Sequence, residues 1–212
     1  MSPSAAPVVH IAVLAKAPLA GLAKTRLAPA LGLDGAAALA EKMLQHAVAQ
    51  AVAAALGPVT VWATPDPGHP AFQRLRATHG LSLATQGEGD VGQRMAQVFD
   101  AAERQGRLPL LLMGTDLPGI TAAVLRQAAA LLADHEVVIV PALDGGYGCI
   151  GLRQAAPSLF SGVTWSTSSV LAQTRQRIAA LGWRVAELAA VADIDEPADL
   201  VHLPPGWWDA ES

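Results

Sequence analysis

The sequence predicts a single α/β domain with a doubly wound, mainly parallel central sheet. Segments typical of strands alternate with segments typical of helices along most of the 212 residues. The segments at 8–14 (VVHIAVL) and 109–113 (PLLLM) are apolar almost throughout, as in strands that are buried on both faces of a parallel sheet. We therefore expect one core over residues 8–200, followed by a tail over 203–212.

In the first half of the chain, strand and helix signals follow one another closely. Asp34 should cap a helix that Gly57-Pro58 ends near residue 56. The apolar face of that helix recurs at every fourth position, at Leu44, Val48, Val52 and Leu56. Asp90 should cap a later helix over 91–104. Further segments are expected as strands at 8–14, 59–64, 81–85 and 109–113, and as a short helix at 70–79.

The second half continues this alternation with weaker signals. Thr121 should cap a helix that runs to about residue 134, and Trp165-Ser166-Thr167 should cap one that Gly182 ends. The strand-like segments are 136–141, 147–152, an edge strand at 183–188 and, at 192–195, a short strand or extended segment. Glu196-Pro197 should open a last helical turn. In the tail, Trp207 and Trp208 should dock onto the core or onto a partner subunit.

Composition excludes several classes of protein. The formal net charge is −4, so no overall positive field attracts nucleic acid. Although 52% of the residues are hydrophobic, no run reaches the ~18 consecutive apolar residues of a membrane span. The first residues lack the basic stretch of a secretory signal, and Cys149 is a single cysteine that cannot form an internal disulfide. We expect a cytoplasmic protein without a membrane or nucleic-acid partner.

The loop after the first strand carries three cations close to a proline and a glycine: Lys16, Pro18, Gly21, Lys24 and Arg26. Open α/β sheets bind ligands at the carboxyl ends of their strands, and three cations there indicate a phosphorylated ligand. The stretch ends in Lys-Thr but is not a P-loop, because Ala23 stands where that motif has glycine directly before its lysine. Alternatively, the cations only solvate a surface loop.

Asp116 is the sharpest candidate for a metal ligand, because it follows the buried strand at 109–113 and should face the ligand crevice. Mg²⁺ (or Mn²⁺) favours one or two protein carboxylates together with phosphate oxygens of the substrate. Asp193 and Asp195, two residues apart on an extended segment, should point the same way, so either could supply a second ligand. Alternatively, Asp116 bonds its own turn and Asp195 caps the following helix.

Two further motifs are candidates for binding a ligand. The first, Asp144-Gly145-Gly146-Tyr147, has adjacent glycines that allow a ligand to approach the backbone, although a plain hairpin turn has the same pattern. The second, Trp165-Ser166-Thr167, could present free N–H groups to an anion or simply cap a helix. Arg94 could reach a phosphate or lie on a solvated helix face.

Other catalytic patterns are missing from the sequence. The six histidines show no spacing typical of zinc ligands, and no serine lies in a GxSxG turn. Cys149 has no histidine near it in sequence. Nucleophilic hydrolysis is therefore disfavoured.

Taken together, the motifs resemble the DUF2064 family, a GT-A-type group related to the guanylyltransferase CofC and, more distantly, to MobA. The blocks that carry this resemblance occur in the family's order, at Ala15–Pro18 with Gly21, Lys24–Leu27 with Leu31-Gly32, Gly92–Met95, Gly114–Pro118, Asp144–Leu152, Trp165–Thr167 and Asp193–Leu200. The resemblance implies a GT-A, Rossmann-like nucleotide-diphospho-sugar transferase fold. Gly148-Cys149 departs from the bulkier aromatic and apolar pair typical of the family, which leaves the identity of the acceptor open.

The resemblance also implies a division of labour within the site. The first loop (Lys16, Pro18, Gly21, Lys24 and Arg26) would lie near the nucleotide, and Asp116 would hold a divalent metal with a C-terminal aspartate such as Asp195 nearby. The blocks at 144–147 and 165–167 would line the acceptor side.

These observations favour a metal-dependent transferase that uses a nucleotide-activated donor and a small-molecule acceptor, with a homodimer left open. The first hypothesis is nucleotidyl transfer from an NTP to a phosphorylated acceptor, in which Asp116 holds Mg²⁺ and both Lys24 and Arg26 stabilise the charge that grows on the triphosphate. The second is glycosyl transfer from a nucleotide sugar, with Asp144 as the acceptor base. A third, from another class, is a nucleotide-binding protein without turnover.

Overall fold

The computed structural model describes residues 8–207, and its elements follow the predicted alternation closely. The strands are β1 (His10–Lys16), β2 (Val59–Thr64), β3 (Ser82–Thr85), β4 (Leu110–Met113), β5 (Val137–Pro141), β6 (Tyr147–Leu152) and β7 (Val185–Glu187). The α-helices are α1 (Ala28–Ala53), α2 (Pro70–His79), α3 (Val91–Arg104), α4 (Ala122–Leu131) and α5 (Val170–Ala180). Short 3₁₀ helices are η1 (Thr25–Leu27), η2 (Pro157–Leu159) and η3 (Pro197–His202).

Within the described residues the strands form a seven-stranded sheet in the order β3-β2-β1-β4-β6-β5-β7. The neighbouring strands pair in parallel except for β6, which is antiparallel to both β4 and β5. The predicted mainly parallel sheet is therefore confirmed, and β7 lies at an edge as expected. Because β1 and β4 are adjacent and parallel, their carboxyl ends open at the same edge of the sheet.

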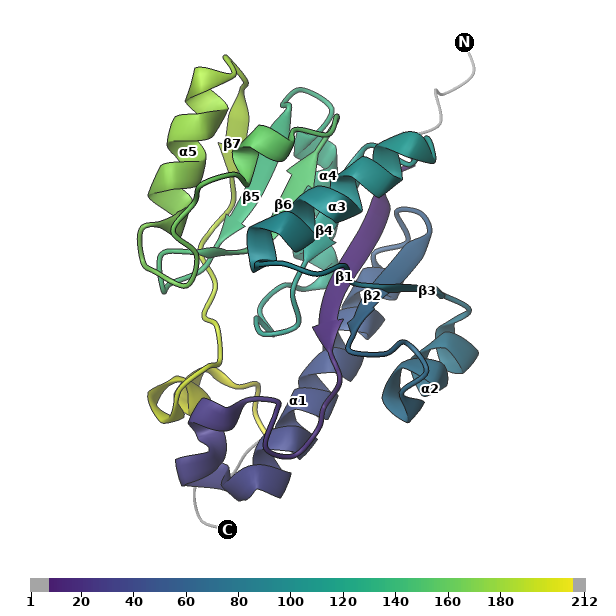
Figure 1. Ribbon diagram of the computed structural model, residues 1–212, viewed down its shortest axis with the longest axis vertical. Helices are drawn as coiled ribbons and strands as arrows, with labels where there is room; N and C mark the ends of the chain where they lie inside the picture. The colour runs from purple at the N-terminus through teal and green to yellow at the C-terminus, as the bar shows by residue number, and fades with distance from the viewer. Residues whose placement is uncertain (1–7, 208–212) are drawn as a thin grey trace.

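Helices cover both faces of the sheet (Figure 1). On one face α1, α2 and α4 pack against it through Val48, Phe72 and Leu125, each of which is fully buried. On the other face α3 and α5 contribute Phe99 and Ile178 to a second apolar cluster. Each face therefore has its own core, which is the doubly wound arrangement that the alternating pattern predicts.

A third apolar cluster joins the two ends of the chain. Leu27 and Met43 pack there against Ile194 and Leu200 of the C-terminal segment. Figure 1 shows this segment, in yellow, running from the sheet to the start of α1. Trp207 continues the contact, because its ring lies edge-on to that of His46 at 5.0 Å between centroids. Trp207 thus docks onto the core as predicted, whereas Trp208 lies outside the described residues.

The first helix differs from its predicted bounds. It begins at Ala28 rather than at Asp34, because Pro29 is accepted in the first turn. Gly32 then interrupts it with non-helical φ and ψ of 70° and 170°. The helix ends at Ala53, earlier than Gly57-Pro58 suggested, and Ala55 follows with a left-handed φ of 54°.

The predicted cap of α5 is wrong. The segment 165–167 does not cap this helix, because Ser166 has a φ of 60° and Thr167 Oγ1 donates to the Thr164 carbonyl at 2.7 Å. Of the two structures that the sequence allowed for 192–195, a short strand or an extended segment, the strand does not form. In that part of the structure an isolated bridge joins Val191 to Ala142 instead.

A membrane-spanning helix is not found among residues 8–207.

The cap of α3 is as predicted, because Asp90 and Gln93 exchange side-chain and backbone hydrogen bonds at the helix start.

Candidate active site

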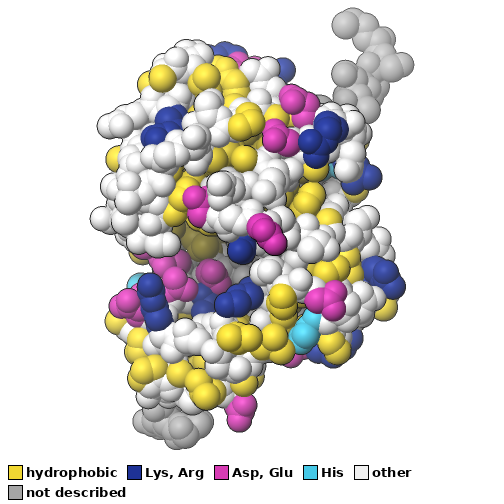
Figure 2. Space-filling view, viewed as in Figure 1, with side chains coloured by type: hydrophobic (Ala, Val, Ile, Leu, Met, Phe, Trp, Pro, Cys, Tyr) yellow, Lys and Arg dark blue, Asp and Glu magenta, His cyan; other side chains and the backbone are white. Residues whose placement is uncertain are grey.

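A cleft of about 790 Å³ opens at the carboxyl ends of β1 and β4. Figure 2 shows it as a hollow with both positive and negative side chains around it. It brings together most of the predicted site residues: Lys16, Lys24, Arg26, Arg94, Asp116, Tyr147, Trp165, Ser166 and Asp195. A smaller pocket of about 210 Å³ is lined by several of these and by Asp144, Gly146, Thr167 and Asp193. Pro18, Gly21 and Gly145 line neither cavity.

Lys24 is held between two carboxylates, Asp116 and Asp195, at one end of the cleft. Its Nζ lies 2.5 Å from Asp116 Oδ1 and 2.7 Å from Asp195 Oδ1, and it donates to the Ile194 carbonyl at 2.6 Å. The Lys24 side chain is only 9% exposed, while those of Asp116 and Asp195 are 48% and 46% exposed. The three N–H groups of the ammonium therefore all donate to protein oxygens, while the two carboxylates remain partly exposed to the cleft.

This arrangement keeps Lys24 charged. Burial alone would lower its pKa, but the adjacent carboxylates of Asp116 and Asp195 outweigh burial and raise the pKa above 10.5. The Lys24 backbone has a left-handed φ of 48° and ψ of 40°, which is uncommon for a residue other than glycine.

Backbone contacts bring the C-terminal carboxylate to Asp116. The N–H of Ile194 donates to the Asp116 carbonyl at 3.0 Å, and the Ile194 side chain is fully buried. Asp199 then accepts hydrogen bonds from the backbone N–H groups of Asp195 and Glu196 at 3.0 and 2.7 Å. Glu196 and Asp199 make the capping box of η3, so Asp195 is not the cap that the sequence allowed.

The donor set at Asp116 and Asp195 fits Mg²⁺ or Mn²⁺. Both carboxylates lie within reach of one small cation, since a single ammonium group already contacts them both. Among residues 8–207 no three His, Cys, Asp or Glu side chains are grouped to hold a metal ion. A bound cation would therefore take its remaining ligands from substrate oxygens and water, as Mg²⁺ commonly does.

Asp193 is placed differently from Asp195. It lines the smaller pocket, and no ion pair joins it to Lys24 in the described part of the chain. Burial raises its pKa, and the nearby carboxylates of Asp144, Asp195 and Asp199 raise it further. Of the two predicted C-terminal candidates, the structure brings Asp195 to Asp116.

The other predicted cations surround the cleft without entering the carboxylate cluster. Lys16 Nζ donates to the Leu22 carbonyl at 2.7 Å, and Arg94 Nε donates to the Gly89 carbonyl at 3.0 Å. Arg26 lies 3.9 Å from Glu196 Oε1, and both side chains are mostly exposed. Exposed pairs of this kind are weak, so Arg26 can exchange its partner for an anionic ligand at little free-energy cost.

The motif at 144–147 is both a hairpin turn and part of the site. Gly146 N donates to Asp144 Oδ1 at 2.7 Å, which closes the turn between β5 and β6. Gly145 has a φ of 89°, and a Cβ there would lie 2.3 Å from the Ser168 carbonyl oxygen. The Tyr147 hydroxyl is buried beside Thr174, where burial raises its pKa, and has no hydrogen-bond partner among residues 8–207.

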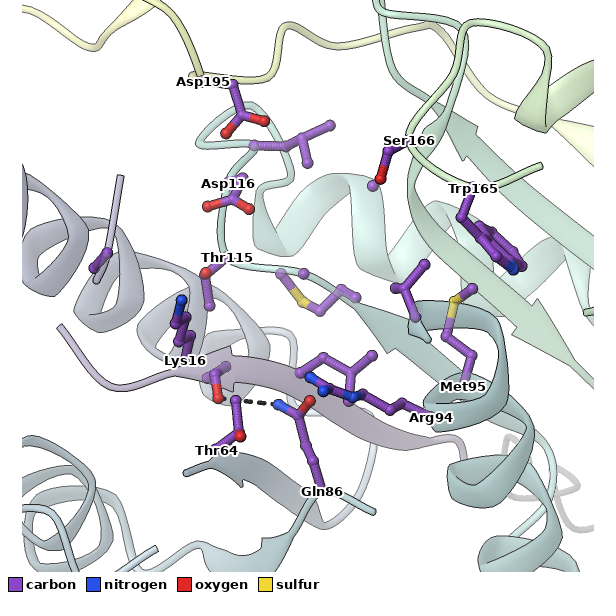
Figure 3. Close-up of a pocket in the computed structure, with 18 of the residues that line it drawn as sticks. Lys16, Thr64, Gln86, Arg94, Met95, Thr115, Asp116, Trp165, Ser166 and Asp195 are labelled. Atoms are coloured by element: carbon purple, nitrogen blue, oxygen red, sulfur yellow. Dashed lines mark hydrogen bonds between the residues drawn. The ribbon is translucent and has the colours of Figure 1, made fainter. Parts of the chain in front are cut away.

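Trp165 packs against Gly92, a residue of the separate Gly92–Met95 block. A Cβ on Gly92, in the first turn of α3, would lie 2.4 Å from the indole of Trp165. The ring therefore packs directly on the start of α3 and forms one wall of the cleft. Figure 3 shows Trp165 and Ser166 approaching from the side opposite Lys16.

Sequence reasoning missed Gln86, Thr64 and Thr115, which also line the cleft. Each follows or ends a strand at the same sheet edge as Lys16 and Asp116. That shared position is the signal that could have identified them, since parallel strands present their carboxyl ends together.

Comparison with protein families then decides the assignment. The model of DUF2064, described as uncharacterised proteins conserved in bacteria, matches residues 43–167. The chain belongs to the DUF2064 family. The matched residues include Arg94, Asp116 and the motifs at 144–147 and 165–167. Lys24 and Asp195 lie outside the matched residues, and the structure alone brings them to Asp116.

Three known proteins are similar to this DUF2064 member. The phosphoenolpyruvate guanylyltransferase of Sphaerobacter thermophilus is 29% identical over 184 residues, which cover 85% of this chain and 86% of that protein. A crystal structure from Desulfovibrio desulfuricans G20, provisionally described as a nucleotide-diphospho-sugar transferase, matches with a TM-score of 0.83 and 28% identity. That match covers 91% of this chain and 84% of the other.

The third is the Rv0371C protein of Mycobacterium tuberculosis H37Rv, solved in complex with manganese, with a TM-score of 0.51 and 16% identity. The match covers 92% of the DUF2064 chain and 97% of that protein. At this level of identity the similarity shows a shared fold. The GT-A-type fold that the motifs implied is confirmed by the more similar Desulfovibrio structure.

Proposed function

We propose that this protein is a metal-dependent nucleotidyltransferase, which transfers a nucleoside monophosphate from an NTP to the phosphate group of a small acceptor. The observation that carries this proposal is the convergence of Lys24, Asp116 and Asp195 at the sheet edge. The similarity to a phosphoenolpyruvate guanylyltransferase supports it and makes GTP and phosphoenolpyruvate the first substrates to test.

The reaction needs positioning and charge stabilisation rather than a protein nucleophile. A phosphate oxygen of the acceptor attacks the α-phosphorus of the NTP, the bond to the β-phosphate breaks, and pyrophosphate leaves. Lys16, Lys24, Arg26 and Arg94 surround the cleft and would stabilise the negative charge on the triphosphate. Cys149 takes no part, because it is fully buried and burial raises its pKa to about 12.

Asp116 and Asp195 would hold Mg²⁺ or Mn²⁺, and the manganese complex of a protein with this fold is consistent with that assignment. Such a cation, when bound, supplies positive charge that offsets the charge of the leaving pyrophosphate. The protein's own part is to hold both carboxylates at a fixed separation, through their contacts with Lys24 and the Ile194–Asp116 backbone hydrogen bond. Asp193 would instead lie on the acceptor side.

The smaller pocket would receive the acceptor. It adjoins the carboxylate pair and is lined by Tyr147, Trp165, Ser166 and Thr167. The Gly145 and Gly146 turn brings this wall close to the segment that follows Trp165. A small acceptor there would lie next to the α-phosphate of a nucleotide bound at Lys24.

Glycosyl transfer is the second candidate function. The description of the Desulfovibrio structure favours it, and Asp144 in the smaller pocket could act as the base for an acceptor hydroxyl. A third possibility is that the protein binds nucleotides without turnover. The experiment below distinguishes it, because neither pyrophosphate nor a nucleoside diphosphate would then be released.

The test is to incubate the purified protein with Mg²⁺ and either GTP plus phosphoenolpyruvate or a panel of nucleotide sugars. Release of pyrophosphate that depends on the acceptor supports nucleotidyl transfer, and release of a nucleoside diphosphate supports glycosyl transfer. Asp116→Asn should abolish the metal-dependent rate, whereas Asp134→Asn, at an exposed position beyond α4, should retain it. Normal turnover by the Asp116 variant would refute the metal assignment.

A further inference from the structure

Gln86 lies at the opposite end of the cleft from the carboxylate pair. In Figure 3, Asp116 and Asp195 occupy one end, and Gln86 lies at the other with Thr64 and Arg94 beside it. The residue follows β3 directly, and its backbone N–H donates to the Ala63 carbonyl at 2.9 Å. Its backbone therefore continues the β2–β3 pairing by one step and is as firmly placed as a strand residue.

The side-chain amide of Gln86 is fixed in one orientation. Nε2 donates to the Ala15 carbonyl at 3.0 Å and to the Trp62 carbonyl at 2.7 Å. Both partners are backbone acceptors, so only the nitrogen of the amide can face them. The oxygen, Oε1, must then point away from the sheet.

This oxygen is an unused acceptor at the wall of the cleft. No residue among 8–207 donates a hydrogen bond to Oε1, and it is not one of the buried unpaired atoms of that region. Since Gln86 lines the cleft, its free lone pairs face the space that a ligand would enter. Both amide protons are already committed to the sheet, so Gln86 can recognise only a donor.

The position of this acceptor relates it to the nucleotide, and here the argument rests on the proposed function. If the triphosphate lies at Lys24, Asp116 and Asp195, the base lies toward the far end of the cleft. Guanine presents N1–H and the 2-amino group side by side, two donors that a single amide oxygen can accept. We propose that Gln86 Oε1 accepts hydrogen bonds from the Watson–Crick edge of guanine, including its 2-amino group, and so sets the base specificity of the enzyme.

Binding of GTP and ITP tests this without reference to turnover, because ITP differs from GTP only in lacking the 2-amino group. Calorimetric titration with each nucleotide and Mg²⁺ should show that the wild-type protein binds GTP about tenfold more tightly than ITP, the effect of one hydrogen bond. Gln86→Met removes the acceptor for both donors, so it should weaken GTP binding by at least this factor and bring the GTP/ITP ratio close to one.

Gln97→Met is the matched control. Gln97 Nε2 donates to the Glu88 carbonyl at 3.1 Å, so it fixes the same loop, but its side chain does not line either cavity. This variant should keep the wild-type ratio, and thermal melts should show that both variants are folded.

Equal affinity of the wild-type protein for GTP and ITP would overturn the role of Gln86 even if the variant failed to fold, and it would leave nucleotidyl transfer standing. A preserved ratio in folded Gln86→Met would overturn it as well. Failure of the wild-type protein to bind any nucleotide would instead overturn both the base-reading role and the proposed function.

Discussion

Replacing Lys24 with methionine should destabilise the ligand-free protein, and a divalent cation should reverse the loss. Methionine retains most of the apolar stem but removes the ammonium group that contacts Asp116, Asp195 and the Ile194 carbonyl. The variant therefore leaves two carboxylates facing each other without a neutralising charge. A divalent cation is the ligand that such a pair favours.

The free energy of unfolding lost in Lys24→Met can be estimated from the exposure of the three side chains. Removal of one partner from a fully buried ion pair costs about 3–5 kcal/mol, whereas fully exposed pairs contribute about 0–1 kcal/mol. Here the lysine is 9% exposed but the carboxylates are 48% and 46% exposed. We therefore expect a loss of about 2 kcal/mol, which in a domain of this size lowers Tm by about 4–8 °C.

Melting curves at pH 7 measure the loss of stability under conditions in which the Lys24 ion pairs contribute fully to folding. Since the folded-state pKa of Lys24 is raised, its contribution is complete below 10.5 and is lost only as the pH rises through the raised value. A cation at about thirty times its Kd would return about 2 kcal/mol to the variant. Lys42→Met, at an exposed site on α1, is the control for loss of charge.

Two results would refute this reasoning. A melting temperature of Lys24→Met equal to that of the wild type would show that these ion pairs contribute nothing to stability. Equal stabilisation of wild type and variant by Mn²⁺ would show that the cation binds away from the carboxylate pair.

Three further predictions concern the surroundings of the site. Because the pKa of Asp193 is raised, its favourable contribution to folding is present below pH 3.8 and is lost at higher pH. Thermal melts of Asp193→Asn should therefore show a free energy of unfolding that is higher by up to about 1 kcal/mol at pH 7 and unchanged at pH 3. The Arg184 guanidinium and backbone hold the pKa of Glu136 at about 2, so the wild-type Tm should fall more steeply between pH 4.5 and 2 than that of Glu136→Gln. Gly92→Ala should displace the Trp165 ring, which should shift the tryptophan fluorescence and raise the KM for the acceptor several-fold while the affinity for GTP is retained. An unchanged emission spectrum would contradict the packing of Trp165 on Gly92.

Much of the fold is predictable because its signals are local. The bounds of α3 agree with the prediction because Asp90 and Gln93 form a capping box at its start. The meeting of Lys24 and Asp116 also follows from sequence, since both come after strands that end at the same sheet edge.

What the sequence did not reveal depends on tertiary contacts. The packing of Leu27 and Met43 on Ile194 and Leu200 joins the two ends of the chain, and no local pattern encodes that contact. The same packing of Ile194 selects Asp195 over Asp193 as the partner of Lys24. Gln86 was missed because its role depends on two carbonyls that are distant in sequence.

The central claim is that Lys24, Asp116 and Asp195 form one centre for a metal ion and a triphosphate. A crystal structure of the protein with GTP and Mn²⁺, using the anomalous signal of manganese, tests it most directly. Our account predicts a manganese peak between Asp116 and Asp195, with the Lys24 ammonium turned to a phosphate oxygen. A peak elsewhere, with the Lys24 ion pairs intact and the triphosphate outside the cleft, would contradict it.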